Sequence, residues 1–305
     1  MRVLFTGATG VLGRAAVPQL VAAGHEVIAV ARSDDDATWL SNTGAVPRWV
    51  DLFDPSAVHA AMGGVETVVH HATSIPPLKS MANRKAWQAN DRLRSDATSI
   101  LVDAATANDV ARFVQQSITF IYADGGDSWL DETAPIAPTW DVLESALDAE
   151  ANIDRFRDSG GAGVTLRLSR LYGPGPASAA YIASVAKRKL PIVGDGQNYV
   201  SSLHTHDAAT ATLVALTAPA GTYNISDDEP QRAADHTTTL AELLGAPEPR
   251  RVPGWLARLV AGDTITLLTT SQRISNSRFK ESTGWEPKFP SATAGWQDVL
   301  ADSRE

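Results

Sequence analysis

The sequence predicts an α/β fold, in which a doubly wound parallel sheet carries a smaller, mostly helical C-terminal substrate region. Short apolar runs alternate with segments of helical spacing up to about residue 175, a pattern typical of a parallel sheet covered on both faces. A glycine-rich turn joins the first run to the first helical segment. The chain has 305 residues, of which 44% are hydrophobic, so it is long enough to bury a full core.

The expected elements follow in order along the chain. Apolar runs predict strands at 2–5, 25–33, 45–55, 65–73, 111–118, 164–175 and 221–226. Helical spacing predicts helices at 15–23, 56–62, 87–108, 141–150 and 207–219. We expect residues 1–170 to form the dinucleotide-binding domain, with 205–225 returning to it. The substrate-binding region is then expected from 171–204 and 226–305.

Composition excludes several classes of function. The formal net charge is −9, which argues against a nucleic-acid or anionic-membrane partner, because both require clustered Lys and Arg. The chain has no cysteine, which excludes disulfides, thiol catalysis and thiolate metal sites. The N-terminus leaves no room for a signal peptide, and no apolar run approaches the ~20 residues of a membrane span. We expect a cytoplasmic protein that acts on a small molecule, with a homodimer as one assembly.

Three glycines mark the expected cofactor loop. Gly7, Gly10 and Gly13 form G-x-x-G-x-x-G directly between a strand and a helix. Glycine allows a tight turn and a close approach of a pyrophosphate, which the free N–H groups of the helix N-terminus then hold. The alternative is a tight turn that binds no ligand. The predicted binding loop consists of Gly7, Thr9, Gly10, Val11, Leu12 and Gly13.

The end of the second strand favours NADP(H) over NAD(H). An NAD site usually offers an acidic residue there, but this chain has Ala31 followed by Arg32 and Ser33. A guanidinium can pair with a 2′-phosphate in bidentate fashion. The alternative is that Arg32 is a solvated loop residue, and the aspartates at 34–36 would repel a phosphate if they pointed inward.

With this loop the chain resembles the extended short-chain dehydrogenase/reductase superfamily, the NAD-dependent epimerase/dehydratase group, whose sheet is of the Rossmann type. "TGATGVLG", "DLFDP", "VVHHAT", "LRLSRLYGPG", "PIVGDG", "LHTHDAATA", "YNISDDEP" and "TGWEPKFP" are similar to its landmarks in order. The resemblance implies further cofactor contacts, to adenine and ribose, from Asp51, Leu52, His71, Ala72 and Thr73.

The resemblance also implies a Ser/Thr–Tyr–Lys catalytic set, which this chain lacks. The Tyr position falls on Val142 and the Lys position on Ala146, and the upstream Ser position falls at or next to Ile118. None of the five tyrosines has a lysine four residues on. The arginine that often grips a nucleotide diphosphate is also missing, because Val200 and Ser201 stand there, so a nucleotide-sugar substrate is not expected.

Hydroxyl groups near the end of the fifth strand are the remaining catalytic candidates. Ser117, Thr119 and Tyr122 lie where a binding cleft opens in such sheets, and each could donate a hydrogen bond to a substrate carbonyl. The alternative is that they are ordinary strand-end and turn residues.

Two further side chains are candidate substrate contacts. Arg170 could hold a carboxylate or an enolate, or it could be solvent-facing or salt-bridged. His204 is a candidate acid or base on a loop that could approach the cleft. The His70–His71 pair and the His204-x-His206 spacing lack a third ligand at a recognisable distance, so we predict no metal site.

Three functions remain open from the sequence. The first is an NADP(H)-dependent oxidoreductase on a small carbonyl or enone. The second is an NADP-binding sensor or regulator without turnover. The third is a non-redox cyclase or lyase that uses the same cleft. Consumption of the cofactor separates the first from the other two.

Overall fold

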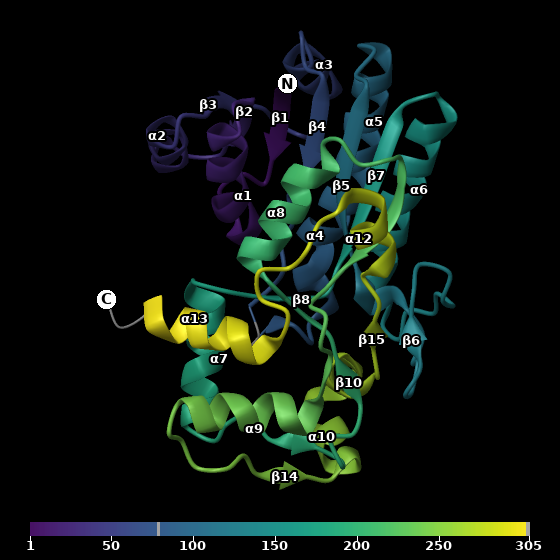
Figure 1. The fold of residues 1–305 in the computed structure, drawn as a ribbon. Helices are drawn as coiled ribbons and strands as arrows, with labels where there is room; N and C mark the ends of the chain where they lie inside the picture. The colour runs from purple at the N-terminus through teal and green to yellow at the C-terminus, as the bar shows by residue number, and fades with distance from the viewer. Residues whose placement is uncertain (78–79, 303–305) are drawn as a thin grey trace.

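The computed structural model describes residues 1–77 and 80–302, so residues 303–305 at the end of the predicted substrate-binding region lie outside it. Within these residues, seven parallel strands form one sheet (Figure 1). Its order is β12-β7-β5-β4-β1-β2-β3. The strands are β1 (Arg2–Thr6), β2 (Glu26–Ala31), β3 (Val46–Trp49), β4 (Thr67–His70), β5 (Arg112–Ile118), β7 (Ala162–Leu168) and β12 (Gly221–Ile225). The order runs outward from β1 and β4 in both directions, which confirms the expected doubly wound sheet.

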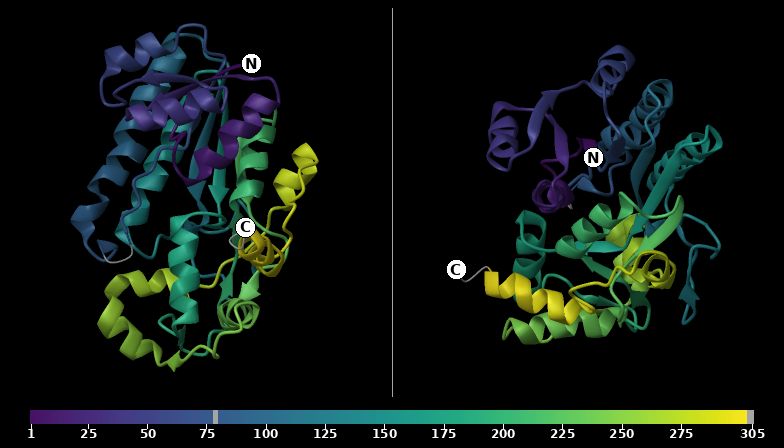
Figure 2. Two further views of the ribbon diagram at one scale, coloured as in Figure 1. Left: turned by 90° about the vertical axis from the view of Figure 1, so that its left-hand side faces the viewer. Right: turned by 45° about the horizontal axis from the view of Figure 1, so that its top comes forward.

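Helices cover both faces of the sheet, as expected. One face packs against α1 (Val11–Ala22) and α8 (Thr205–Ala215), which lie side by side in Figures 1 and 2. The other face packs against α3 (Pro55–Ala61), α5 (Thr98–Ala107) and α6 (Glu144–Asp158). Each strand end is thereby held between two helical layers, which fixes the loops that follow the strands.

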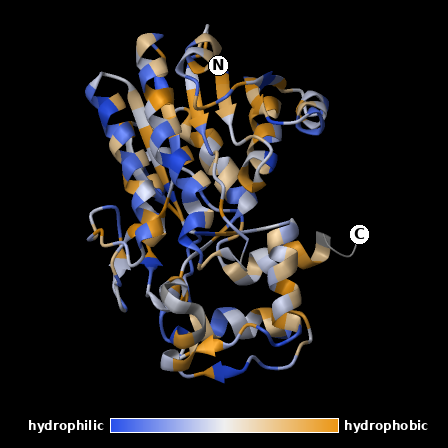
Figure 3. Cartoon of the chain, turned by 180° about the vertical axis from the view of Figure 1, so that it is seen from behind, coloured by the Kyte–Doolittle hydropathy of each residue, from blue (hydrophilic) through white to orange (hydrophobic). Residues whose placement is uncertain are grey.

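The alternation of side chains along each strand creates two separate cores. In β1, Phe5 and Val3 face the α1–α8 layer, whereas Leu4 faces α3 and α5. All three side chains are buried. Figure 3 shows the hydrophobic residues concentrated on the sheet. Both sides of the strands are apolar, which explains why the strands are continuous apolar runs in the sequence.

The C-terminal region adds short helices and two-stranded pairs, most of them below the carboxyl edge of the sheet, whereas α12 (Ser277–Thr283) packs beside the sheet against β12 (Figure 1). Its helices are α7 (Pro176–Ala186), α9 (Ala233–Leu243), α10 (Gly254–Ala261), α11 (Thr266–Thr269), α12 and α13 (Ala292–Asp302). The pairs are β8 (Arg170–Tyr172) with β11 (Ser202–His204), β9 (Ile192–Val193) with β14 (Arg251–Val252), β10 (Tyr199–Val200) with β13 (Gln231–Arg232), and β6 (Trp129–Leu130) with β15 (Arg273–Ile274).

Two helical segments differ from the sequence expectation. Residues after Ser33, for which no element is predicted above, form a helix, α2 (Asp34–Asn42), because Ser33 caps its N-terminus and three aspartates suit the positive end of its dipole. The helix expected at 87–108 is divided into α4 (Gln88–Arg92), a π-helical turn η3 (Leu93–Ala97) and α5. None of the helices in the described ranges is long and apolar enough to cross a membrane.

Candidate active site

The predicted functional residues converge because parallel strands all end at one edge of the sheet. The strand order β2-β1-β4-β5-β7 sets their order along this edge. The residues that follow these strands are, in turn, Arg32, the loop 7–13, residues 71–73, Thr119 and Arg170. The edge therefore offers a cofactor region over β2, β1 and β4 and a second region over β5 and β7.

Glycines shape the loop after β1. A Cβ atom on Gly7, whose φ is +77°, would lie 2.5 Å from the backbone of His71 and Ala72, and one on Gly13 would lie 2.2 Å from the Gly7 carbonyl oxygen. Gly10 is the N-cap of α1 and provides no side chain to its free N–H groups. A Cβ on Gly10 would meet only the Gly7 oxygen, at 3.3 Å. The open, uncapped helix end fits the diphosphate of a dinucleotide.

Arg32 and Ser33 follow β2 but have different environments. The Ser33 hydroxyl accepts a hydrogen bond from the Asp36 N–H at 3.1 Å, so it caps α2. The Arg32 side chain is 79% exposed, and its Nε lies 3.9 Å from the Asp36 carboxylate. Arg32 is thus held only by a weak surface ion pair, which leaves the guanidinium free to reach a phosphate. The preference for NADP(H) stays a prediction.

The residues predicted to lie near the adenine and ribose differ in their exposure and in the direction of their side chains. Asp51 is exposed and its carboxylate accepts the Phe53 N–H at 2.9 Å, whereas Leu52 is buried in the core beside α3 and α5. The His71 ring turns toward the α8 layer, where Nε2 lies 3.0 Å from the Thr212 hydroxyl. Burial lowers the pKa of His71 to about 3, so its ring is neutral.

The end of β4 is tied to the helical segment opposite. His70 Nε2 lies 3.1 Å from the Leu93 carbonyl oxygen and donates to it, while Nδ1 accepts from the Thr6 hydroxyl. Burial lowers the pKa of His70 to about 4, which keeps the ring in this neutral form. Ala72 and Thr73 follow, half-buried, beside the glycine loop.

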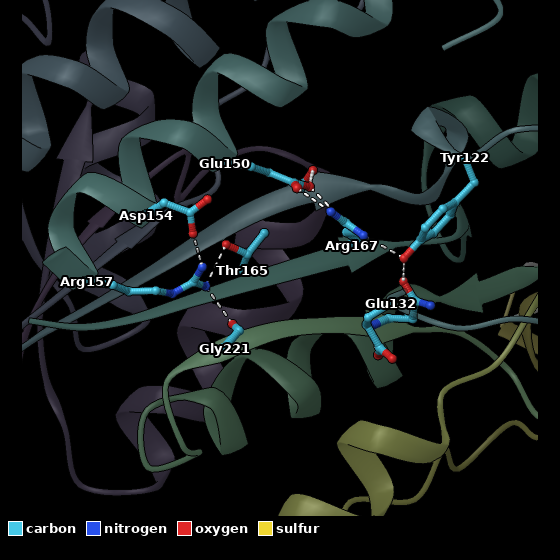
Figure 4. Close-up of polar contacts among 10 residues, drawn as sticks. Tyr122, Glu132, Glu150, Asp154, Arg157, Thr165, Arg167 and Gly221 are labelled. Atoms are coloured by element: carbon cyan, nitrogen blue, oxygen red, sulfur yellow. Dashed lines mark hydrogen bonds and ion pairs between the residues drawn. The ribbon is translucent and has the colours of Figure 1, made fainter. Parts of the chain in front are cut away.

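Tyr122 belongs to a buried network around the Glu150–Arg167 ion pair (Figure 4), and Ser117 binds the same carboxylate. Ser117 donates to Glu150 at 2.5 Å, and Arg167 binds the same carboxylate through two nitrogens at 2.9 and 2.6 Å. The Tyr122 hydroxyl accepts from Arg167 at 2.7 Å and donates to Asn224 at 2.8 Å. Burial raises the pKa of Tyr122 to about 12. Both hydroxyls therefore have protein partners, which favours a structural role.

Thr119 instead lines a small pocket beyond the ends of β5 and β7. Its lining residues are Thr119, Phe120, Arg170, Tyr199, Val200, Ser201, Leu267, Thr270 and Gln272. Arg170 donates to the Leu267 carbonyl oxygen at 2.9 Å and has no carboxylate partner within the described ranges. Desolvation lowers the pKa of this guanidinium. An incompletely paired cation is suited to an anionic ligand.

Val142 and Ala146 lie in an apolar cluster. Val142 belongs to the 3₁₀ turn η5 (Asp141–Leu143) and Ala146 to α6, and both side chains are completely buried. They share the cluster with Trp87 and Trp140, whose rings meet edge to face at 5.3 Å. Neither side chain can hold or move a proton. Their correspondence to the Tyr and Lys positions of the resemblance stays a prediction.

His204 begins α8 instead of lining the pocket. Its Nδ1 accepts the His206 N–H at 3.2 Å, which caps the helix. Its ring packs against Phe289, with centroids 4.3 Å apart, and against the edge of Tyr172. Desolvation lowers its pKa. In the part of the chain that the structure describes, no three His, Cys, Asp or Glu side chains gather as a metal-ligand set.

Two polar residues that were not predicted from the sequence, Asn90 and Arg94, lie opposite the end of β4. Both are buried, on α4 and η3 respectively. Their spacing of four residues gave a signal, because it places them on one face of a helix, but charge and polarity alone suggested a solvated surface.

The comparisons with known proteins agree with this arrangement. The model of the NAD dependent epimerase/dehydratase family matches residues 3–226. A 3-diazoavenalumate denitrifying reductase of a Streptomyces species is 37% identical, and the alignment covers 98% of this chain and 99% of that protein. A 2-alkyl-3-oxoalkanoate reductase of Stenotrophomonas maltophilia is 30% identical, with 81% and 77% covered.

A solved structure shares the fold. The crystal structure of Thermus thermophilus UDP-glucose 4-epimerase in complex with NAD superposes with a TM-score of 0.80 at 22% identity, and covers 100% of this chain and 99% of that one. The glycine loop, the sheet order and the family match point in one direction. The chain belongs to the NAD dependent epimerase/dehydratase family, whose members bind NAD(P).

Proposed function

We propose that the protein is an NADP(H)-dependent reductase that passes hydride to a small, anionic aromatic substrate bound at the ends of β5 and β7. The loop after β1 would hold the diphosphate, and Arg32 the 2′-phosphate. The cofactor, when bound, supplies the hydride. Phe120 provides an apolar ring in the pocket, and Arg170 provides the positive charge.

The apolar environment of Val142 and Ala146 is the observation that carries this proposal. Reduction of a ketone produces an alkoxide, which must receive a proton. Among the described residues, the cluster around these two positions is apolar, and the adjacent hydroxyl, that of Ser145, already donates to the Val142 carbonyl oxygen at 3.4 Å. The hydroxyls of Ser117 and Tyr122 also have partners. The site therefore favours a hydride acceptor whose reduction needs no proton from the protein.

An aryl diazo compound is such an acceptor. Hydride forms a C–H bond at the ring carbon of an aryl diazonium, the C–N bond breaks, and its electron pair leaves with dinitrogen. Charges balance without proton uptake. The relative that is 37% identical is named for a denitrifying reduction of 3-diazoavenalumate. A substrate of this class would explain why a reductase works without an acid at positions 142 and 146.

Arg170 is the side chain that we expect to orient the substrate. Its guanidinium donates to one carbonyl oxygen, so it has further N–H groups for a carboxylate. Thr119 lies on the same pocket wall and could donate to a phenolic oxygen. Together they would direct the ring toward the cofactor region over β4 and β1.

Turnover of a substrate panel tests the proposal. NADPH is mixed with an aryl diazo carboxylate, a ketone and an enone, and the organic products and dinitrogen are measured. We expect release of dinitrogen in proportion to NADPH consumed, well above the reaction without protein. A Gly10→Val variant serves as the control, since it is expected to keep the fold and lose the cofactor. Equal rates with this variant would contradict the proposal.

Carbonyl reduction is the second candidate, because the 30%-identical relative is named a 2-alkyl-3-oxoalkanoate reductase. Thr119 or Arg170 would then have to stabilise the developing oxyanion, with the proton coming from water. Faster turnover of the ketone or enone than of the diazo compound would support this candidate. Tight cofactor binding without any turnover would support the regulator instead.

A further inference from the structure

Arg94 is a buried cation without a hydrogen-bond partner. It is only 3% exposed, and it lies on the π-helical turn η3 between α4 and α5. No hydrogen bond or ion pair involves its guanidinium in the described ranges, and its Nε is completely enclosed. Most buried charges are paired, so this one is an exception that requires a reason.

Nearby carboxylates do not neutralise Arg94. Desolvation lowers the pKa of Arg94 to about 10, and the attraction of Asp91 and Glu150 offsets this only in part. Glu150 is already bound by Arg167 and Ser117. Asp91 is half-buried and pairs through Oδ2 with Arg84 at 2.5 Å, while its Oδ1 is enclosed and makes no hydrogen bond to Arg94 or to any other described residue. The charge of Arg94 is therefore available to a ligand.

Asn90 provides a second unpaired donor on the same face. It is completely buried, and its Oδ1 accepts the Ser74 N–H at 3.2 Å. Its Nδ2 is enclosed and has no partner. Asn90 and Arg94 are four residues apart and so lie on one side of the α4–η3 segment. Two buried side chains thus present unpaired N–H groups together.

The position of this pair points to the ligand. His70, the last residue of β4, donates to the Leu93 carbonyl at 3.1 Å, and Ser74 binds Asn90. The pair therefore lies at the loop that follows β4. In the sheet, β4 is next to β1, on the side away from β2. If the diphosphate lies at the β1 loop and the adenosine over β2, the other half of the dinucleotide extends over β4.

We propose that Asn90 and Arg94 bind the ribose on the nicotinamide side of the dinucleotide, by donating hydrogen bonds to its hydroxyl oxygens. Arg94 then supplies a positive charge beside α6, whose first turn contains Ala146 and no Lys or Arg. A π-turn suits this role, since such turns occur often at functional sites and redirect the side chains that follow. The inference depends on dinucleotide binding, and it holds whichever substrate is reduced.

Binding and stability together test the inference. Arg94→Met keeps the length of the side chain and removes its charge, and Arg94→Lys keeps the charge. Arg155→Met, on the exposed side of α6, is the matched control. NADPH, NADH, ADP-ribose and ADP are titrated against each variant, and the melting temperature is measured without ligand.

We expect Arg94→Met to weaken the binding of NADPH, NADH and ADP-ribose by about 10- to 100-fold, and the binding of ADP by less than about 2-fold. The melting temperature should stay the same or rise, because an unpaired buried charge is replaced by an apolar group. Arg94→Lys should recover part of the affinity, and Arg155→Met should bind like the unaltered protein. The inference is overturned if ADP weakens as much as ADP-ribose, if no ligand weakens, or if affinity is lost only together with a lower melting temperature.

Discussion

Three hydroxyl groups near the end of β5 differ in whether they are available to a substrate, because their hydrogen-bond partners differ. Ser117 and Tyr122 point into the Glu150–Arg167 network, whereas Thr119 lies on the pocket wall. The sequence places all three within six residues, but the partners come from α6, β7 and β12, which are distant in the chain. Hydrogen-bond partners, more than residue type, decide which hydroxyl remains available to a substrate.

The glycines of the loop should respond differently to substitution. Gly13→Ala should destabilise the fold, because its Cβ would lie 2.2 Å from a carbonyl oxygen. Gly10→Val should leave the fold intact and abolish most dinucleotide binding, since the added carbons cover the helix N-terminus. Urea unfolding and NADPH titration of both variants check this. Normal NADPH affinity in Gly10→Val would mean that the loop is only a turn.

Arg32 should set the choice of nucleotide. We expect NADPH to bind more tightly than NADH, and Arg32→Ala to weaken NADPH by about 10- to 100-fold while NADH changes little. Fluorescence titration of both nucleotides against both proteins is the measurement. Equal affinities for the two nucleotides in the unaltered protein would rule out a role for Arg32 in recognition of the 2′-phosphate.

Among the elements, those with long regular patterns could be predicted and the short ones could not. The seven strands and the helices α1, α3 and α8 follow from apolar runs and periodicity. The two-residue strands such as β9 and β10 are too short to show a period of two. The helix α2 was not predicted, although Asp34, Asp35 and Asp36 suit the first turn of a helix.

Only the parts of the candidate site that depend on local backbone conformation could be predicted from the sequence. The glycine loop could be identified because its conformation demands glycine. The burial of Arg94 could not, because it depends on a π-turn and on packing between α4 and α6. Arg170 was named from the resemblance, but its bond to Leu267 joins segments 97 residues apart and has no local signature.

A double substitution near the start of α6 tests whether positions 142 and 146 correspond to the missing Tyr and Lys. Val142→Tyr with Ala146→Lys places a phenol and an ammonium group in the cluster that holds Trp87 and Trp140. We expect a loss of stability of about 2–4 kcal/mol, from overpacking and from burial of a charge. If the variant still folds, ketone reduction should rise above that of the unaltered protein. Unchanged ketone turnover in a folded variant would contradict the assigned positions.

Across the whole molecule, buried histidines should make stability depend on pH. Burial lowers the pKa of His70 to about 4 and those of His71 and His236 to about 3, from 6.5. The unfolded chain takes up these protons near pH 6.5, whereas the native protein does not. These histidines therefore leave the free energy of unfolding unchanged above pH 6.5. They lower it as the pH falls from 6.5 toward their native pKa values of about 3 to 4.

Between the native pKa and the unfolded pKa, each of these histidines should lower the free energy of unfolding by about 1.4 kcal/mol for each pH unit of acidification. Urea unfolding at about pH 7.5 and about pH 5 measures the slope. His236→Gln should reduce the slope, whereas His59→Gln, on the exposed side of α3, should leave it unchanged. Equal slopes in all three proteins would show that His236 does not titrate as its burial requires.

If hydride reaches the substrate without a proton from the protein, the new hydrogen on the product must come from the cofactor alone. An aryl diazo carboxylate is reduced with NADPH that carries deuterium at its transferable position, and in a second reaction with ordinary NADPH in D₂O. We expect one deuterium, at the ring carbon that lost nitrogen, in the first product and none at that carbon in the second. Deuterium from solvent at that carbon, or no transfer from the cofactor, would contradict the proposed hydride transfer.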